Sequence, residues 1–202
     1  QLGFALSDLG NNAKAIACFK QVLKKNPLSP EAHFGLGNVY FDETRMSKTI
    51  REYKKALKLA PDYEGARVGL GDAYLETGRI KQAEREYRKT LSYFPFSFLA
   101  HIGLGDVYLE RKDLGSALKE YQIALTLNQR SVYAHIGVAD VFLARKNFKK
   151  AVSEYEKAIK LAPGFVRTYF YLGNVYLTLK QLKKAEALYK KTLELNPNFE
   201  DG

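Results

Sequence analysis

The chain has 202 residues, of which 46% are hydrophobic and 27% are charged, and its formal net charge is +10. This composition is typical of a protein that forms a core, and it excludes an intrinsically disordered chain. Charges or glycines interrupt every apolar stretch well before the roughly 20 residues that a membrane-crossing helix needs. The single cysteine, Cys18, excludes an intrachain disulfide and a cysteine-based zinc site.

An internal repeat with a period of 34 residues organises the chain. Its markers are Pro27, Pro61, Pro95, Pro163 and Pro197, with Gln129 where one proline is missing. A fixed period of this length indicates stacked supersecondary units. Residues 1–29 match the later part of one unit, and five full units follow without a gap: 30–63, 64–97, 98–131, 132–165 and 166–199.

Each unit is predicted to be a pair of amphipathic helices. In the first half of a unit a leucine, a glycine and a tyrosine recur, as in Leu36, Gly37 and Tyr40, and in the second half an alanine and a tyrosine recur, as in Ala83 and Tyr87. Spacings of three and four residues place each group on one helix face. The second helices are predicted at 13–26, 47–60, 81–94, 115–128, 149–162 and 183–196, each running toward the unit's proline or its substitute.

The first helix of most units is expected to begin after a side chain that accepts hydrogen bonds from the free amides of the first turn. These expected caps are Ser29, Asp62, Ser97 and Ser131. A single helix pair cannot bury both of its faces, so the pairs are expected to stack on one another.

The order Leu-Gly-x-x-Tyr, Ala, Tyr, Ala, Pro at a period of 34 resembles the tetratricopeptide repeat (TPR) family. The resemblance covers nearly the whole chain and implies an all-α fold, a right-handed α-solenoid superhelix of helix-turn-helix repeats, as a single domain over residues 1–202. It also implies that the first helices line a concave groove and that the second helices face outward. One departure is the family's usual Trp, which is replaced by His33, Arg67, His101, His135 and Tyr169.

The charge is segregated between the two kinds of helix. The predicted second helices hold 22 basic and 8 acidic residues, a net of +14, whereas the rest of the chain has a net of −4. With the orientation that the resemblance implies, the outer side is basic and the inner side is acidic. Acidic residues punctuate the basic helices at pairing distances and no aromatic residues interleave with the lysines for base stacking, so a solvated surface is expected rather than a nucleic-acid site.

Two columns on the inner face of the first helices are predicted to line the ligand groove. One is apolar and the other is polar: Phe34, Val68, Ile102, Ile136 and Phe170, then Asn38, Asp72, Asp106, Asp140 and Asn174. An apolar strip beside carboxylates suits a peptide with apolar and basic side chains rather than an acidic one. The alternative is that the polar column caps or bonds the helix itself and has no ligand.

A column of mid-helix glycines, Gly35, Gly69, Gly103 and Gly137, indicates close helix contact or room for a ligand backbone. We favour close packing, because glycine inside a helix costs about 1 kcal/mol relative to alanine and needs a compensating reason.

No catalytic, cofactor or metal site is predicted. The Gly-Leu-Gly strings lie inside helices and lack the third glycine of a nucleotide-binding loop. Histidines one unit apart, such as His101 and His135, are expected to lie too far from each other to share a metal ion.

The sequence therefore predicts a non-catalytic adaptor that binds a peptide or helix of another protein in its groove. The alternative is an assembly protein that self-associates through its end faces or docks on an anionic surface through its outer lysines. Because Gln1 aligns inside a first helix, we expect the natural chain to continue on the amino side. The partner and the compartment do not follow from these residues.

Overall fold

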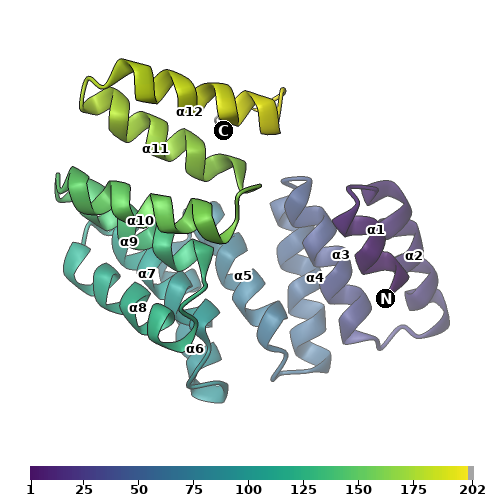
Figure 1. Ribbon diagram of the computed structural model, residues 1–202. Helices are drawn as coiled ribbons and strands as arrows, with labels where there is room; N and C mark the ends of the chain where they lie inside the picture. Colours follow the sequence, from purple (N-terminus) through teal and green to yellow (C-terminus); the bar gives the residue numbers. More distant parts are fainter. Residues whose placement is uncertain (200–202) are drawn as a thin grey trace. The chain divides into compact units, whose positions relative to one another are not determined.

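The computed structural model describes residues 1–199, and this part of the chain consists of α-helices joined by short turns, without a strand (Figure 1). The all-α helical repeat fold is confirmed. The first helices of the pairs are α1 (Leu2–Asp8), α3 (Pro30–Asp42), α5 (Glu64–Glu76), α7 (Phe98–Glu110), α9 (Val132–Ala144) and α11 (Val166–Thr178). The second helices are α2 (Asn12–Lys25), α4 (Met46–Leu59), α6 (Ile80–Tyr93), α8 (Leu114–Leu127), α10 (Phe148–Leu161) and α12 (Leu182–Leu195). Each second helix begins and ends one residue before its predicted span.

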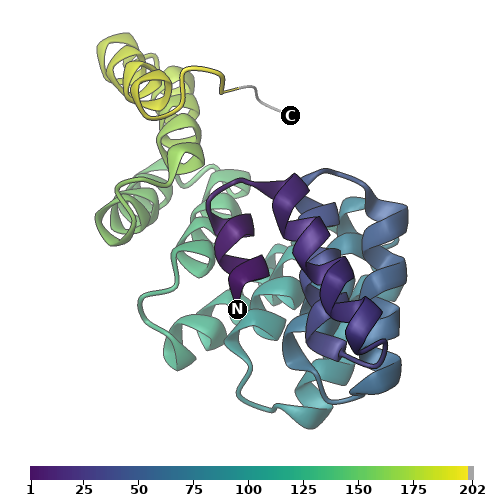
Figure 2. The same ribbon diagram turned by 90° about the vertical axis from the view of Figure 1, so that its right-hand side faces the viewer.

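The chain divides into two compact units, one from Gln1 to Gly103 and one from Leu104 onward. In the first unit α3 packs on α4 and α5 on α6, while α2 contacts α3 and α4 contacts α5, so each pair stacks on the next. Figure 2 shows this unit with the α1 and α2 pair in front and the following pairs behind it. The stacking explains how helices with apolar residues on two faces become buried on both.

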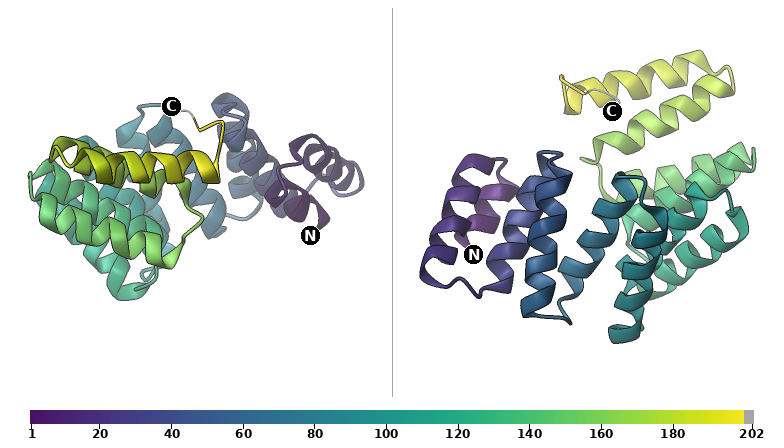
Figure 3. Two further views of the ribbon diagram at one scale, coloured as in Figure 1. Left: turned by 45° about the horizontal axis from the view of Figure 1, so that its top comes forward. Right: turned by 180° about the vertical axis from the view of Figure 1, so that it is seen from behind.

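The second unit repeats the same scheme. In it α8 contacts α9, α9 pairs with α10, α10 contacts α11, and α11 pairs with α12. The two views of Figure 3 show α11 and α12 as an antiparallel hairpin, so that the start of α11 and the end of α12 lie at the same end of the pair.

Helix starts follow the expected caps at three of four places. The hydroxyls of Ser29, Ser97 and Ser131 accept hydrogen bonds from the backbone N–H groups three residues later. The expectation for Asp62 is wrong: α5 begins after Tyr63, which makes no side-chain cap. Tyr63 occupies the repeat position of the serines, whereas Asp62 lies one residue too early to reach the first turn.

The turn inside each helix pair uses one residue in the left-handed region of the backbone. Glycine occupies it at Gly10 and Gly78, but Thr44, Lys112, Lys146 and Lys180 also adopt φ values of 56° to 60°. These positions are one period apart, so the reversal is a property of the repeat and is imposed even on residues for which it is unfavourable.

The core consists of the second-helix alanines and tyrosines together with small and branched residues of the first helices. Tyr87, Tyr121 and Tyr155 are among the largest side chains without solvent exposure, and Ala83, Ala117 and Ala151 are fully covered. These columns lie on the second helices and pack against the first helices. They therefore determine the position of the first helices, which carry the inner face.

Candidate functional site

The predicted polar column is bound to the tyrosine column of the second helices. In every full repeat the tyrosine hydroxyl donates a hydrogen bond to Oδ1 of the Asn or Asp fifteen residues earlier. The pairs are Tyr53 to Asn38 at 2.8 Å, Tyr87 to Asp72 at 2.7 Å, Tyr121 to Asp106 at 2.5 Å, Tyr155 to Asp140, and Tyr189 to Asn174 at 2.7 Å. We refer to these five pairs as the Tyr–Asx ladder. The alternative expected from the sequence was a structural role for this column within its own helix, and the observed partner is instead the tyrosine of the second helix.

The tyrosines of the ladder are buried except for Tyr189, and its Asn and Asp side chains are half-buried. This burial changes the pKa values of several of these groups. The pKa of Asp140 is raised to about 6, chiefly by burial and also by repulsion from Asp106, although the hydrogen bond from Tyr155 lowers it. Burial also raises the pKa of Tyr53, Tyr121 and Tyr155, and neighbouring carboxylates add to the shift. The hydroxyls therefore remain protonated donors, and Asp140 is mostly ionised near neutral pH.

The apolar column is less accessible than its sequence position predicts. Val68, Ile102 and Ile136 are only 8% to 9% exposed, whereas Phe34 and Phe170 are half-buried. The Phe34 ring centroid lies 5.0 Å from that of Tyr63 and 5.9 Å from that of Tyr53. The Phe170 ring lies 5.9 Å from Tyr189 and 5.3 Å from Phe199. Only the two ends of the apolar column thus retain substantial surface for a ligand.

The glycine column serves close packing. A Cβ atom placed on Gly137 would lie 2.4 Å from the Tyr121 ring, and one on Gly103 would lie 2.3 Å from the Tyr87 ring. A Cβ on Gly105 would lie 2.5 Å from the Tyr121 ring, and one on Gly71 would lie 2.5 Å from the Tyr87 ring. Each of these rings therefore fills the space between two glycines, one from its own repeat and one from the next. No room for a ligand backbone remains at these glycines, and the packing interpretation holds.

The column in which the family usually has Trp forms buried polar pairs with the second helices. His33 Nδ1 lies 2.8 Å from Glu52 Oε2, Arg67 Nη1 lies 3.1 Å from Glu86 Oε2, and His135 Nδ1 lies 2.7 Å from Glu154 Oε2. Burial raises the pKa of Glu52, but hydrogen bonds from His33, Lys55 and Arg51 outweigh it and hold the pKa below its usual range.

The sequence carries a signal for these pairs that the motif search did not use. A glutamate precedes the core tyrosine in four repeats, whereas Leu188 precedes Tyr189 in the last. That same repeat has Tyr169 instead of a histidine or arginine, and its hydroxyl donates to the carbonyl oxygen of Pro163 at 2.9 Å. The repeat that lacks the glutamate thus also lacks the basic residue, so the two positions change together.

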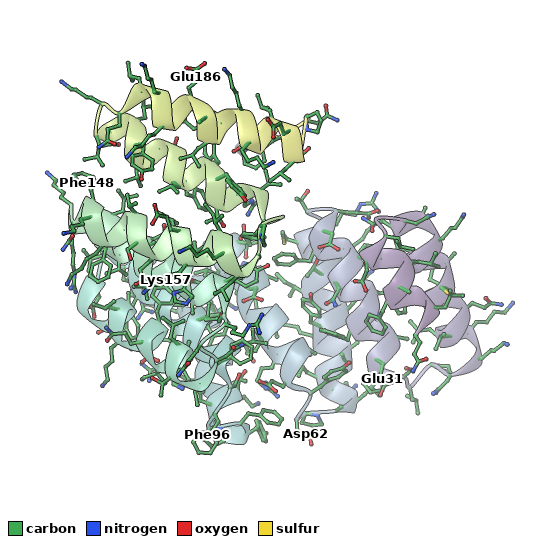
Figure 4. All side chains as sticks on the ribbon, in the orientation of Figure 1. Glu31, Asp62, Phe96, Phe148, Lys157 and Glu186 are labelled. Carbon is green, nitrogen blue, oxygen red and sulfur yellow. The ribbon has the colours of Figure 1, made fainter. Side chains whose placement is uncertain are left out.

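The observed helices confirm that basic residues are concentrated in the second helices and acidic residues predominate in the first helices. The second helices contain 22 basic and 8 acidic residues, and the first helices contain nine acidic residues and two basic ones, Arg67 and Arg167. Helix α2 carries four lysines and no acidic residue. Figure 4 shows charged side chains such as Lys157 and Glu186 on second helices, and it shows Phe96, which is 80% exposed, in the loop that follows α6.

A pocket that the sequence did not indicate lies in the second unit. Its lining includes Tyr133 at the start of α9, Phe165 and Arg167 around the start of α11, and Asn196, Asn198 and Phe199 after α12. The signal available in the sequence was weak, because these residues lie at repeat boundaries, where the repeat columns vary.

Within residues 1–199, no three His, Cys, Asp or Glu side chains come together as ligands for a metal ion. None of the helices in the same part of the chain combines the length and apolarity that crossing a bilayer requires.

The fold and its periodic contacts define a helical-hairpin repeat protein. A sequence profile for the tetratricopeptide repeat matches residues 1–64 and 68–132, and two related profiles match residues 166–199 and 139–180. The chain therefore belongs to the tetratricopeptide repeat family. Repeats of this family generally mediate contacts between proteins and typically act as non-catalytic scaffolds. Comparison with curated proteins finds no match.

Solved structures share the fold at low sequence identity. The Cut9–Hcn1 hetero-tetramer of APC/C matches with a TM-score of 0.87 and 18% identity, over 98% of this chain and 39% of that chain. A thermophilic TPR protein of Thermus thermophilus matches with a TM-score of 0.78 and 23% identity, over 87% of this chain and 96% of that one. YrrB, described as a TPR protein with an unusual peptide-binding site, matches with a TM-score of 0.55 and 20% identity, over 89% and 93%.

Proposed function

We propose that this chain is a non-catalytic adaptor that binds a peptide or helix of a partner protein along the inner face of its first helices, with a preference for apolar and basic side chains. The carrying observation is the Tyr–Asx ladder, which holds Asp72, Asp106 and Asp140 half-buried on helices that are predominantly acidic. Carboxylates in fixed positions on a partly desolvated surface favour a cationic group more than freely solvated ones do. The peptide-binding site of YrrB supports the choice of a peptide.

The half-buried rings at the ends of the apolar column supply the apolar contacts. Phe34 and Phe170 each belong to a cluster of aromatic rings, so a ligand side chain can bury itself against a surface that is already fixed. We assign orientation and specificity to the carboxylates and most of the apolar contact to these two clusters.

The test replaces Asp72, Asp106 and Asp140 together with asparagine. Asn38 and Asn174 already accept the same tyrosine bond, so the triple variant retains the ladder and removes only the charge. Fluorescein-labelled peptides containing Leu, Phe and Lys serve as probes, and anisotropy measures their affinity. We expect at least a tenfold loss for the lysine peptides and little change for matched peptides with Gln in place of Lys. Equal affinity of the wild type and the triple variant for the lysine peptides would refute the assignment of the inner face.

A second candidate function is assembly through the end of the repeat stack. Helix α12 exposes Leu182 at 63% and leaves Leu193 exposed as well, while the equivalent residue of α10, Phe148, is half-buried against its neighbours. Light scattering at rising concentration separates the two functions. A monomer at all concentrations excludes assembly, and a mass that grows with concentration and falls on Leu193→Glu favours it.

A further inference from the structure

The pocket near the start of α11 combines an aromatic lining with a cationic group. The Tyr133 and Phe165 rings meet edge to face with centroids 5.4 Å apart, and Tyr133 is 60% exposed. Phe199 closes another side and packs on Phe170. An exposed, oriented pair of rings beside polar groups is the composition that binding pockets for peptide side chains have.

Arg167 is the charge that sets the chemistry of this pocket. The other basic residue of the first helices, Arg67, is buried in its pair with Glu86, so it cannot serve a ligand. Arg167 is exposed, and within residues 1–199 no acidic side chain pairs with it. A guanidinium group binds a carboxylate through two parallel hydrogen bonds. The neighbouring Asn196 and Asn198 carry amide groups, which can donate to and accept from the backbone of an extended peptide.

Helix α9 connects this pocket to the acidic part of the inner face. Tyr133, Ile136 and Asp140 lie at i, i+3 and i+7 and therefore share one face of the helix. Two helical turns separate Tyr133 from Asp140, about 10 Å along the axis. The same face thus presents a carboxylate at one point and an aromatic, cationic pocket about 10 Å away. An extended peptide covers that distance in about three residues.

From this arrangement we propose that the pocket binds an acidic side chain of an extended peptide, with an apolar side chain next to it against the Tyr133 and Phe165 rings, while a basic side chain about three residues away contacts Asp140. The inference rests on the proposed function and refines it: the ligand is not uniformly basic but carries one Asp or Glu at a fixed distance from its Lys or Arg. The charges of Arg167 and Asp140 then fix the direction in which the peptide lies along α9, because the reversed peptide would place like charges together.

Four fluorescein-labelled peptides test the proposal. All share a Leu and Phe framework with amidated ends and differ at two positions three residues apart, which hold Glu and Lys, Gln and Lys, Glu and Gln, or Lys and Glu. Of the two peptides that contain both Glu and Lys, we expect the wild type to bind one at least tenfold more tightly than the other. The same peptide should bind at least tenfold more tightly than the peptide with Gln in place of Glu. Arg167→Gln should weaken the tight complex about tenfold and leave the peptide with Gln and Lys unaffected. Arg130→Gln, an exposed arginine before α9 that does not line the pocket, is the matched control and should change neither.

The outcomes separate this proposal from the proposed function. If the peptide with Gln and Lys loses affinity in the triple asparagine variant but Arg167→Gln changes nothing, the inner face binds peptides and the proposal that the Arg167 pocket binds an acidic side chain is wrong. A further peptide has Gln in place of Glu and a free C-terminal carboxylate. If it binds as tightly as the Glu peptide and is equally sensitive to Arg167→Gln, the pocket binds a chain end and the proposal is overturned. If no peptide binds, the proposed function fails and the refinement fails with it.

Discussion

Replacing Gly137 with alanine is the sharpest test of the packing at the centre of the second unit. A Cβ at this position would lie 2.4 Å from two atoms of the Tyr121 ring, closer than any stable carbon contact. The ring has little freedom to move, because it also packs tightly against Gly105 and its hydroxyl is bonded to Asp106. Tyr121 has no solvent exposure, so any adjustment displaces the core.

The magnitude follows from opposing contributions. Alanine favours a helix over glycine by about 1 kcal/mol. Overpacking a well-filled core costs about 1–3 kcal/mol, and weakening a hydrogen bond to a carboxylate costs about 1.5–3 kcal/mol. We therefore expect Gly137→Ala to lower the free energy of unfolding by about 1.5–5 kcal/mol.

Gly115 offers a matched control in the same unit. It lies in the first turn of α8, and the nearest atom to an added Cβ is a carboxylate oxygen of Asp113 at 3.6 Å, an ordinary contact. Gly115→Ala should leave the free energy of unfolding unchanged or raise it by up to about 1 kcal/mol. Urea denaturation followed by circular dichroism measures both variants. If Gly137→Ala were as stable as Gly115→Ala, the ring would not be confined by the glycines and the packing argument would be wrong.

Three further predictions concern buried polar contacts. Asp140→Asn should raise the free energy of unfolding by up to about 3 kcal/mol above pH 7 and change it little near pH 4. The pKa of Asp140 is about 6 in the folded state and about 3.9 in the unfolded state. Ionisation of Asp140 therefore destabilises the folded state as the pH rises from about 4 to about 6, and asparagine removes this loss. Glu86→Ala should lower the free energy of unfolding by about 3 kcal/mol, since it leaves the Arg67 guanidinium buried without this carboxylate. Tyr121→Phe should lower it by about 2 kcal/mol, because the hydrogen bond from a buried hydroxyl to the half-buried Asp106 carboxylate is lost.

Each of these predictions has a control of the same chemical type, measured by the same denaturation. Asp62→Asn removes an exposed carboxylate and should show no stabilisation at high pH. Glu194→Ala breaks an exposed pair with Lys191 and should have no measurable effect. Tyr189→Phe breaks a bond to the neutral Asn174 at a half-buried ring and should cost less than Tyr121→Phe. A variant that matches its control would contradict the corresponding prediction.

The repeat register was predictable because it depends on local chemistry that recurs. Proline cannot continue a helix beyond its first turn, and alanine and tyrosine columns at helical spacing define one buried face. The spans of the second helices were therefore correct to one residue. The error at Asp62 arose because the repeat register was not applied there. Its cap propensity was considered residue by residue, whereas the register places Tyr63 at the cap position.

Contacts between the two helices of a pair were harder to predict. The bond from Tyr87 to Asp72 joins residues fifteen apart, and the pair of Arg67 and Glu86 joins residues nineteen apart, so neither follows from the periodicity of a single helix. They depend on how far a side chain reaches across the hairpin. The pocket at Arg167 combines residues at the starts of α9 and α11 with residues that follow α12, and no one repeat contains it.

The Tyr–Asx ladder also explains which property of the inner face can vary among repeats. Tyr53, Tyr87 and Tyr121 each pack against two glycines. Every tyrosine of the ladder needs an acceptor at a fixed distance, which only a short side chain with an oxygen at that point supplies. Asparagine and aspartate both satisfy this geometry, and they differ in charge and hardly at all in shape. The first and last full repeats have Asn38 and Asn174, and the three between them have aspartate. Charge on the inner face can therefore change from repeat to repeat without loss of the fold, and in this chain it is concentrated in the middle repeats, where we expect the basic group of a ligand to bind.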